Sequence, residues 1–292
     1  MTKTSTTPSL QSNRLVPSVQ HRSAPLPRML LTLAVISIIL LTLVGGSLFF
    51  FPQLIQPRWL WSLAPFNTRF LGAIYLSALV GLASMVLARR AALTRLIVPM
   101  TWVFTTVVLI VSCLQLQQFT ATRRATDIWF WLYIIDCLGA TYYLGYYQQH
   151  TYEGLRRLSK PWSVGLGLQA GFLGAYGLGL FLMPAAIGSW WPWPLDPFHS
   201  QLYSSIFLTG AVGAALLSYR ATAIALKALG AVQVTFSVFV LLGVWIVDSA
   251  ANRIDWSAGG NWVWVGAIAL LGLAGVGLIQ QSSQLKNASD HP

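Results

Sequence analysis

Trp59-Leu-Trp-Ser-Leu-Ala-Pro-Phe66 recurs 132 residues later as Trp191-Pro-Trp-Pro-Leu-Asp-Pro-Phe198. Five positions of this octet are identical, in the pattern W-x-W-x-L-x-P-F. The same offset pairs Gly81 with Gly213 in the apolar segments that follow. Recurrence at a fixed offset indicates that the chain is an internal duplication, which constrains the fold more than the activity.

The composition places the duplicated chain in a membrane. Hydrophobic residues make up 55% of it, charged residues 9%, and the mean hydropathy is +0.64, whereas a soluble domain is about 25% charged. Apolar runs of about 20 residues, long enough to cross a bilayer, predict an all-helical bundle of eight transmembrane spans. The expected spans are 29–51, 70–88, 96–115, 128–146, 164–187, 202–219, 224–247 and 262–279.

The eight spans divide into two tandem units of four, 29–160 and 161–280, with a basic tail over 1–28 and a short tail over 281–292. Because four is even, the chain returns to its starting side before the second unit begins, and both units insert the same way round. We therefore expect a pseudo-twofold axis near the membrane normal. The polar first tail has no acidic residue and too few apolar ones to form a core.

The net charge of +11 is explained by membrane orientation and does not indicate a nucleic-acid partner. Of the 18 Lys and Arg residues, 13 lie in the two tails and the loops on their side, and 5 lie on the opposite side. Basic residues favour the cytoplasmic side, which predicts a bacterial-type inner membrane protein with both termini in the cytoplasm.

The tryptophans of the repeated loop, Trp59, Trp61, Trp191 and Trp193, allow two interpretations. They could form an outward-facing platform for an aromatic ligand. Tryptophan also gathers at the bilayer interface, where the ring is buried while its N–H meets water. The second interpretation is favoured, and it makes the motif structural.

Asp136 is the one acidic residue well inside an expected span, and a carboxylate at mid-bilayer costs about 3 kcal/mol on insertion scales. Helical spacing places the phenols of Tyr133 and Tyr143 within its reach. Gln169 and Gln233 lie at comparable depth in other spans. These five residues form a candidate intramembrane polar site, which either handles a solute or locks helices together.

Two details of the fourth and fifth spans follow from spacing. Trp129 and Trp131 match Trp262 and Trp264 at an offset of 133, which pairs Asp136 with Ala269. In the fifth span four small residues share one helical face, which predicts a close helix–helix contact. They are Gly167, Ala170, Gly171 and Gly174.

No catalytic motif, metal-ligand pattern or cofactor motif is evident, so we expect a non-enzymatic protein without cofactor or metal. Cys113 and Cys137 fall inside expected spans, and all four histidines fall outside them, which leaves no bis-histidine pair for a haem. Asp196 and His199 are three residues apart in a proline-rich turn, where a local hydrogen bond or helix cap is expected.

The repeated loop, followed by Arg69-Phe-Leu-Gly-Ala-Ile-Tyr-Leu76, resembles a motif of uncharacterised bacterial multi-pass membrane proteins. Each four-span unit is also similar in topology to the DoxX-like small membrane proteins. Neither resemblance implies an activity or a set of site residues. The second unit departs from the motif, with Gln201 in place of Arg69 and Ser204 in place of Gly72.

Two functions are compatible with this sequence. The featureless apolar spans favour a protein that packs with or supports lipids or other membrane proteins. The alternative is a transporter of a small apolar or lipid-like solute, bound between the two halves near Asp136. A cavity lined by Asp136 and by residues of both halves would favour transport, and a closed, dry seam would favour packing.

The charge distribution generates a topological prediction. A phosphatase that is active only outside the cytoplasm is expected to be inactive when fused after Pro292 and active when fused after Pro197, because the more basic side stays inside. Enzyme assays on cells that express each fusion measure this directly. The opposite pattern of activity would reverse the orientation.

Overall fold

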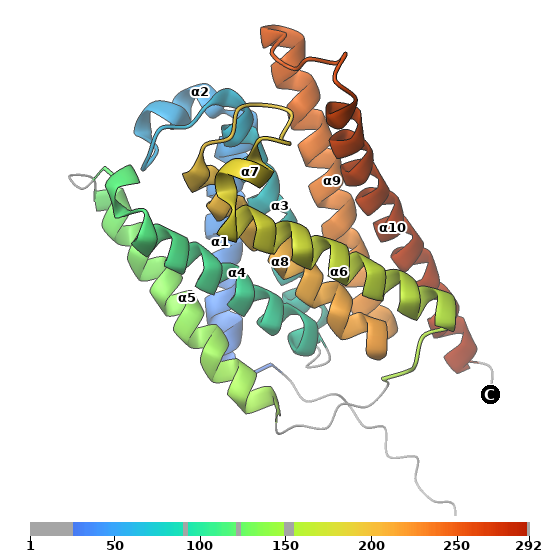
Figure 1. The fold of residues 1–292 in the computed structure, drawn as a ribbon. Coiled ribbons are helices and arrows are strands. Elements are labelled where there is room, and N and C mark those ends of the chain that lie inside the picture. Colours follow the sequence, from blue (N-terminus) through green and yellow to red (C-terminus); the bar gives the residue numbers. More distant parts are fainter. Residues whose placement is uncertain (1–25, 90–92, 121–123, 149–154, 291–292) are drawn as a thin grey trace, which may run out of the picture.

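The computed structural model describes residues 26–89, 93–120, 124–148 and 155–290. Parts of both expected tails, 1–25 and 291–292, lie outside the described residues. Within the described residues there are eight long helices (Figure 1). They are α1 (Arg28–Phe50), α3 (Pro65–Ala88), α4 (Thr94–Leu114), α5 (Arg124–Gln148), α6 (Lys160–Leu182), α8 (Pro197–Tyr219), α9 (Ala223–Ala251) and α10 (Gly259–Asp290).

Seven of these helices are long and apolar enough to cross a membrane, within the ranges that the structure describes. The helix outside this set is α5, where Asp136 and four tyrosines near its end lower the hydropathy. Helix α10 continues to Asp290, past the span end expected at residue 279. The described chain begins and ends at the same end of the bundle (Figure 1).

Proline sets the same turn in both halves. Each of the first hairpins consists of a long helix, a short helix that begins with proline, the W-x-W segment, and a second long helix that begins with proline. The short helices are α2 (Pro52–Ile55) and α7 (Pro184–Gly188), and both lie at the end opposite the two termini (Figure 1). Proline suits the first helical position because its fixed φ matches the helix and its missing N–H has no partner there.

The two halves are interleaved. Within each half, α1 packs on α3 and α6 packs on α8, whereas consecutive helices α3 and α4 scarcely touch. The larger contacts of the central helices cross between the halves, α3 with α9 and α8 with α4. The hairpin at the start of each half therefore rests on the hairpin at the end of the other.

The crossing contacts use residues that match at the offset of 132. A Cβ added to Gly81 would lie 3.3 Å from Val232, and a Cβ added to Gly213 would lie 2.8 Å from the sulfur of Met100. Met100 and Val232 are themselves 132 residues apart. Glycine is needed at both places because any side chain would push the crossing helices apart.

A second matched pair closes the ends of α1 and α6. The Arg69 guanidinium donates a hydrogen bond to the carbonyl of Phe49, and the Gln201 amide donates one to the carbonyl of Phe181 at 3.1 Å. Phe49 and Phe181 match at the same offset. The sequence difference between Arg69 and Gln201 therefore keeps the function of the position, which is to satisfy a carbonyl at a helix end.

The small-residue face predicted on the fifth span makes no close contact. Gly167 and Gly171 of α6 are exposed, and an added Cβ would meet nothing within 4 Å. The tightest crossing instead joins α9 and α10, where a Cβ on Gly230 would lie 2.5 Å from the carbonyl oxygen of Gly275. Spacing shows which residues share a face and does not show which face receives a partner.

The register inferred for the fourth helix of the repeat is wrong by two residues. Trp129 and Trp264 are buried, whereas Trp131 and Trp262 are 64% and 58% exposed. The buried tryptophans are 135 residues apart, although the W-x-W pattern matches them at 133. Burial thus places Asp136 opposite Leu271 and not Ala269, because different connecting segments precede α5 and α10.

The glycine crossing of α9 and α10 generates a stability prediction. Gly275→Ala is expected to destabilise the protein by about 1–3 kcal/mol, because its Cβ would lie 2.7 Å from the Gly230 carbonyl oxygen. Gly266→Ala on the same helix is the control, since its Cβ meets nothing within 4 Å. Unfolding in detergent micelles measures both, and equal effects would contradict the tight crossing.

Candidate binding cavity between two helix hairpins

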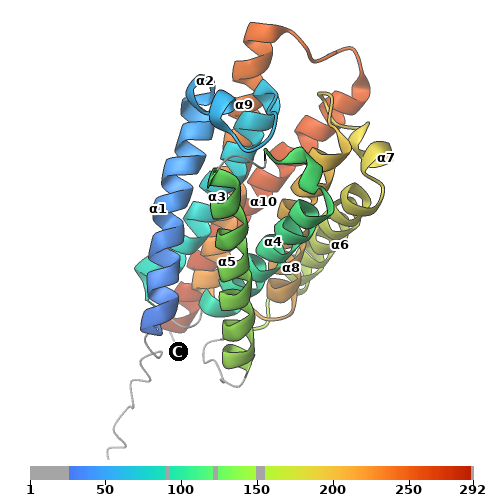
Figure 2. The ribbon, with the colours of Figure 1, turned by 90° about the vertical axis from the view of Figure 1, so that its left-hand side faces the viewer.

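A cavity of 560 Å³ lies between the hairpin α1–α3 and the hairpin α4–α5. Helices α1 and α5 make few contacts, and their close approach is at Gly139, where an added Cβ would lie 3.2 Å from Leu33. Figure 2 shows α1 and α5 on the near side of the bundle. The cavity therefore lies behind the seam between these two helices, with α8 and α9 on its inner side.

The cavity extends along most of the bundle. Its lining on α1 runs from Leu30 to Ser47, which corresponds to about 25 Å of helix. That length approaches the bilayer hydrocarbon thickness of about 30 Å. The walls are mainly aliphatic and aromatic, and the aromatic side chains come from five helices and the first W-x-W loop. They are Trp59, Tyr75, Phe104, Trp129, Tyr133, Phe207 and Phe236.

Asp136 lies at the middle of α5 and faces this cavity. Its side chain is half-buried and makes no hydrogen bond or salt bridge with the described part of the chain. Asp136 is the one acidic side chain of the described lining, and Arg58, at the end near the W-x-W loop, is the one basic side chain. The carboxyl group therefore faces an apolar space without a counterion.

Tyr133 lines the cavity one helical turn from Asp136, but its hydroxyl pairs elsewhere. The Tyr133 and Tyr75 hydroxyl oxygens are 3.3 Å apart, and this contact joins α5 to α3. The Tyr133 ring also packs on Trp129, with ring centroids 4.5 Å apart. The phenol that spacing assigned to Asp136 thus connects the two hairpins, and Tyr75 is a lining residue that spacing did not indicate.

Gln233 brings a polar group from the other half of the chain. It lies on α9, is 4% exposed and lines the cavity. Neither its amide nitrogen nor its amide oxygen has a hydrogen-bond partner among the described residues, and the Thr209 hydroxyl on α8 is in the same position. A buried polar group without a partner costs about 1–3 kcal/mol. These two side chains are therefore available to a bound molecule.

The remaining two residues of the predicted polar site do not reach the cavity. Tyr143 is buried in α5, beside Leu30 and nearer the helix end. Gln169 is half-buried on α6 and is absent from the lining. Of the five predicted residues, the structure brings Asp136, Tyr133 and Gln233 together. Two missed lining residues, Tyr75 and Thr209, looked like ordinary span residues because no sequence pattern indicates which helices meet.

The repeated tryptophans contact protein rather than the bilayer interface. The indole N–H of Trp61 donates to Nε2 of His199 at 3.1 Å, and that of Trp193 donates to Oδ1 of Asn67 at 2.8 Å. Asn67 and His199 match at the repeat offset, so each loop binds the start of the other half. The interfacial interpretation is wrong for Trp61 and Trp193, whose buried N–H groups bond side chains.

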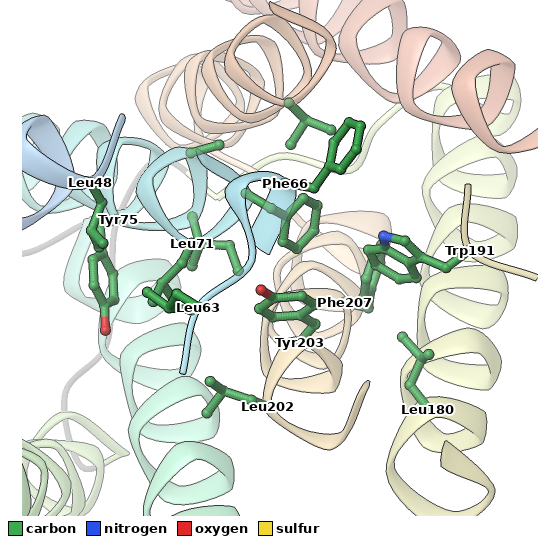
Figure 3. Close-up of a cluster of buried hydrophobic side chains, with 14 of the residues drawn as sticks. Leu48, Leu63, Phe66, Leu71, Tyr75, Leu180, Trp191, Leu202, Tyr203 and Phe207 are labelled. Atoms are coloured by element: carbon green, nitrogen blue, oxygen red, sulfur yellow. The ribbon is translucent and has the colours of Figure 1, made fainter. Parts of the chain in front are cut away.

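The aromatic cluster around these hydrogen bonds is continuous across the halves. Trp193 stacks on Phe66 with centroids 5.0 Å apart, and Trp61 meets Phe198 edge-on at 5.2 Å. Figure 3 shows Tyr203 of α8 at the centre of this buried cluster. A second, more open hollow of 840 Å³ lies between the two loops, bordered by these tryptophans.

Asp196 and His199 form the expected local pair. Asp196 caps α8 by accepting the His199 backbone N–H at 3.0 Å, and its other oxygen lies 2.5 Å from Nδ1 of His199. Burial works to raise the pKa of Asp196. The hydrogen bond and charge of the His199 ring and the backbone N–H groups of His199 and Phe198 outweigh it, so this pKa lies below its ordinary value.

Comparison with protein-family models, curated proteins and solved structures finds no match. No group of His, Cys, Asp or Glu suited to hold a metal ion is found in the described ranges. The fold and the apolar helices define a multi-pass integral membrane protein. Its most developed candidate site is the cavity that contains Asp136.

The cap at α8 generates a pH prediction. Asp196→Ala is expected to destabilise the protein at pH 7 by about 1 kcal/mol, the usual effect of losing a helix cap. The lowered pKa of Asp196 stabilises the fold above the unfolded value of about 3.9, and this stabilisation is lost as pH falls through the folded value. The difference between variant and wild type should therefore shrink below about pH 4.

Unfolding in detergent at pH 7 and pH 3 measures this difference. Asp196→Asn is the control, because it keeps an oxygen for the cap and loses only the charge, which is screened at this half-exposed position. A difference that grows on acidification would contradict the assignment.

Proposed function

We propose that this protein binds a small apolar or lipid-like molecule within the bilayer and carries it, without chemical change. The observation that supports this most is a cavity lined by Asp136 of the first half and by Gln233 and Thr209 of the second. Its volume of 560 Å³ falls within the range of about 300–1,000 Å³ that is typical of small-molecule sites.

Recognition in such a cavity depends on polar groups and fit. A molecule dissolved in lipid gains little from entering another apolar space, because lipid tails are as apolar as leucine. The polar side chains at mid-depth then provide selectivity, and the seam between α1 and α5 provides a route from the lipid. A closed seam without these groups would have favoured a packing role.

The repeat supports the same proposal. We infer that the halves are related by a pseudo-twofold axis near the membrane normal, with eight spans and both termini in the cytoplasm. Supporting observations are the exchanged hydrogen bonds of Trp61 and Trp193 and the matched contacts of Gly81 and Gly213. Transporters built from repeats hold substrate between the halves near the bilayer midplane, where movement of one half exposes it to either side.

A second candidate function, packing against another membrane protein, is favoured by one observation. Gly167 and Gly171 form an exposed face on α6 where no described residue would contact an added Cβ. Small residues let a neighbouring helix approach closely in lipid. This role is compatible with binding in the cavity, because α6 contributes one lining residue, Leu173.

Filling the cavity tests the proposed function. Ser37 of α1 lines the cavity, and Ser37→Phe should lower the affinity for diphenylhexatriene, a neutral apolar fluorophore, by about tenfold, because overpacking costs about 1–3 kcal/mol. Energy transfer from tryptophan to the fluorophore in lipid nanodiscs measures binding, since Trp129 lies in the wall.

The matched control is Thr42→Phe, which places the same ring at an exposed position of α1 outside the lining. It is expected to bind the fluorophore as the wild type does. Equal binding by wild type and Ser37→Phe, or equal loss in both variants, would contradict a site in this cavity.

A further inference from the structure

We infer that the molecule bound in the cavity is a lipophilic monocation, such as an amine with bulky apolar substituents, whose charge lies against Asp136. This inference rests on the proposed function and names the substrate class of the same site. Charge, wall chemistry and unpartnered polar groups lead to it separately.

The charge balance of the cavity favours a cation. Asp136 is the one acidic side chain of the described lining and has no counterion there. The one basic side chain, Arg58, donates to the Leu54 carbonyl at 2.7 Å and lies beside Trp59. The Trp59 ring packs on Trp129, which precedes Asp136 by about 10 Å of helix. Arg58 is therefore too distant to neutralise the carboxylate directly.

The walls near Asp136 suit a cation with apolar substituents. Tyr133 and Tyr75 lie one turn away, and the Phe104 ring centroid is 6.4 Å from that of Tyr133. Aromatic faces attract ammonium groups by about 0.5–2 kcal/mol, more when water is excluded. The aliphatic lining along α1 receives the apolar substituents on either side of the charge.

Two further groups suit an amine in particular. The amide oxygen of Gln233 and the hydroxyl oxygen of Thr209 are buried acceptors without a partner among the described residues, so they can receive N–H groups. A zwitterionic phospholipid fits less well, because its phosphate would find no basic side chain in the part of the lining around Asp136. The structure therefore favours a free lipophilic cation over a membrane lipid.

Binding of a permanent cation should also depend on pH. A protonated Asp136 must release its proton to water before it pairs with the cation, so acid competes with the ligand. Four titratable or charged side chains face the cavity in the described lining: Arg58, Tyr75, Tyr133 and Asp136 itself. Only the carboxyl group among these ordinarily titrates in weak acid.

A pair of ions with the same shape and opposite charge provides the test. Tetraphenylphosphonium and tetraphenylborate are each equilibrated with the full chain in nanodiscs of zwitterionic lipid, and bound ion is measured by dialysis. The wild type is expected to prefer the cation by about tenfold or more, the size of a single partly buried charge interaction. Lowering the pH should weaken cation binding and leave diphenylhexatriene binding unchanged.

Asp136→Asn preserves the shape of the side chain and removes its charge. It should lose about tenfold or more in affinity for tetraphenylphosphonium, become insensitive to pH, and bind diphenylhexatriene as the wild type does. Retained binding of the neutral fluorophore also shows that the variant is folded.

Asp136→Asn that binds the cation as tightly as wild type, or a wild type that prefers the anion, would overturn the inference while leaving the proposed function intact. Failure of the wild type to bind the neutral fluorophore in the cavity would overturn the proposed function, and the inference with it.

Discussion

The exchange of two indole hydrogen bonds holds this membrane protein together. Trp61 reaches His199, and Trp193 reaches Asn67, so each repeated loop is fastened to the first turn of the other half's central helix. In a bilayer, a buried N–H without a partner costs several kcal/mol because no water can replace the bond. The two loops must therefore meet, and their meeting sets the positions of α3 and α8, on which α9 and α4 then pack.

The two halves differ most in how tightly their last two helices cross. At the crossing of α9 and α10, Gly230 and Gly275 bring the backbones into contact. The equivalent positions of the first half are Val98, at the offset of 132, and Ala140, at the offset of 135 given by burial. Both line the cavity. Larger side chains at this crossing keep α4 and α5 further apart, and the space that remains is the candidate site.

The same asymmetry accounts for the placement of polar groups. The tightly packed half contributes Gln233 and Thr209, whose polar atoms have no partner in the described chain, and the looser half contributes Asp136. Both arrangements cost free energy in a low-dielectric interior. A bound molecule that pairs with these groups would recover that cost. This is why polar residues that look destabilising in the empty protein are the best indication of what it does.

The sequence by itself determined the membrane class, the duplication, and the turns of the first hairpins, because these depend on hydropathy and on proline at fixed positions. It also singled out Asp136, since a charged residue within an apolar run is costly wherever the helix lies. Only the tertiary structure decided which faces met. It left the glycine face of α6 exposed, moved the register of the fourth helix by two residues, and joined Tyr133 to Tyr75 in place of Asp136. Helical spacing fixes the neighbours of a residue on its own helix. Partners on other helices depend on how closely side-chain volume lets two backbones approach, and that is a property of pairs far apart in the chain.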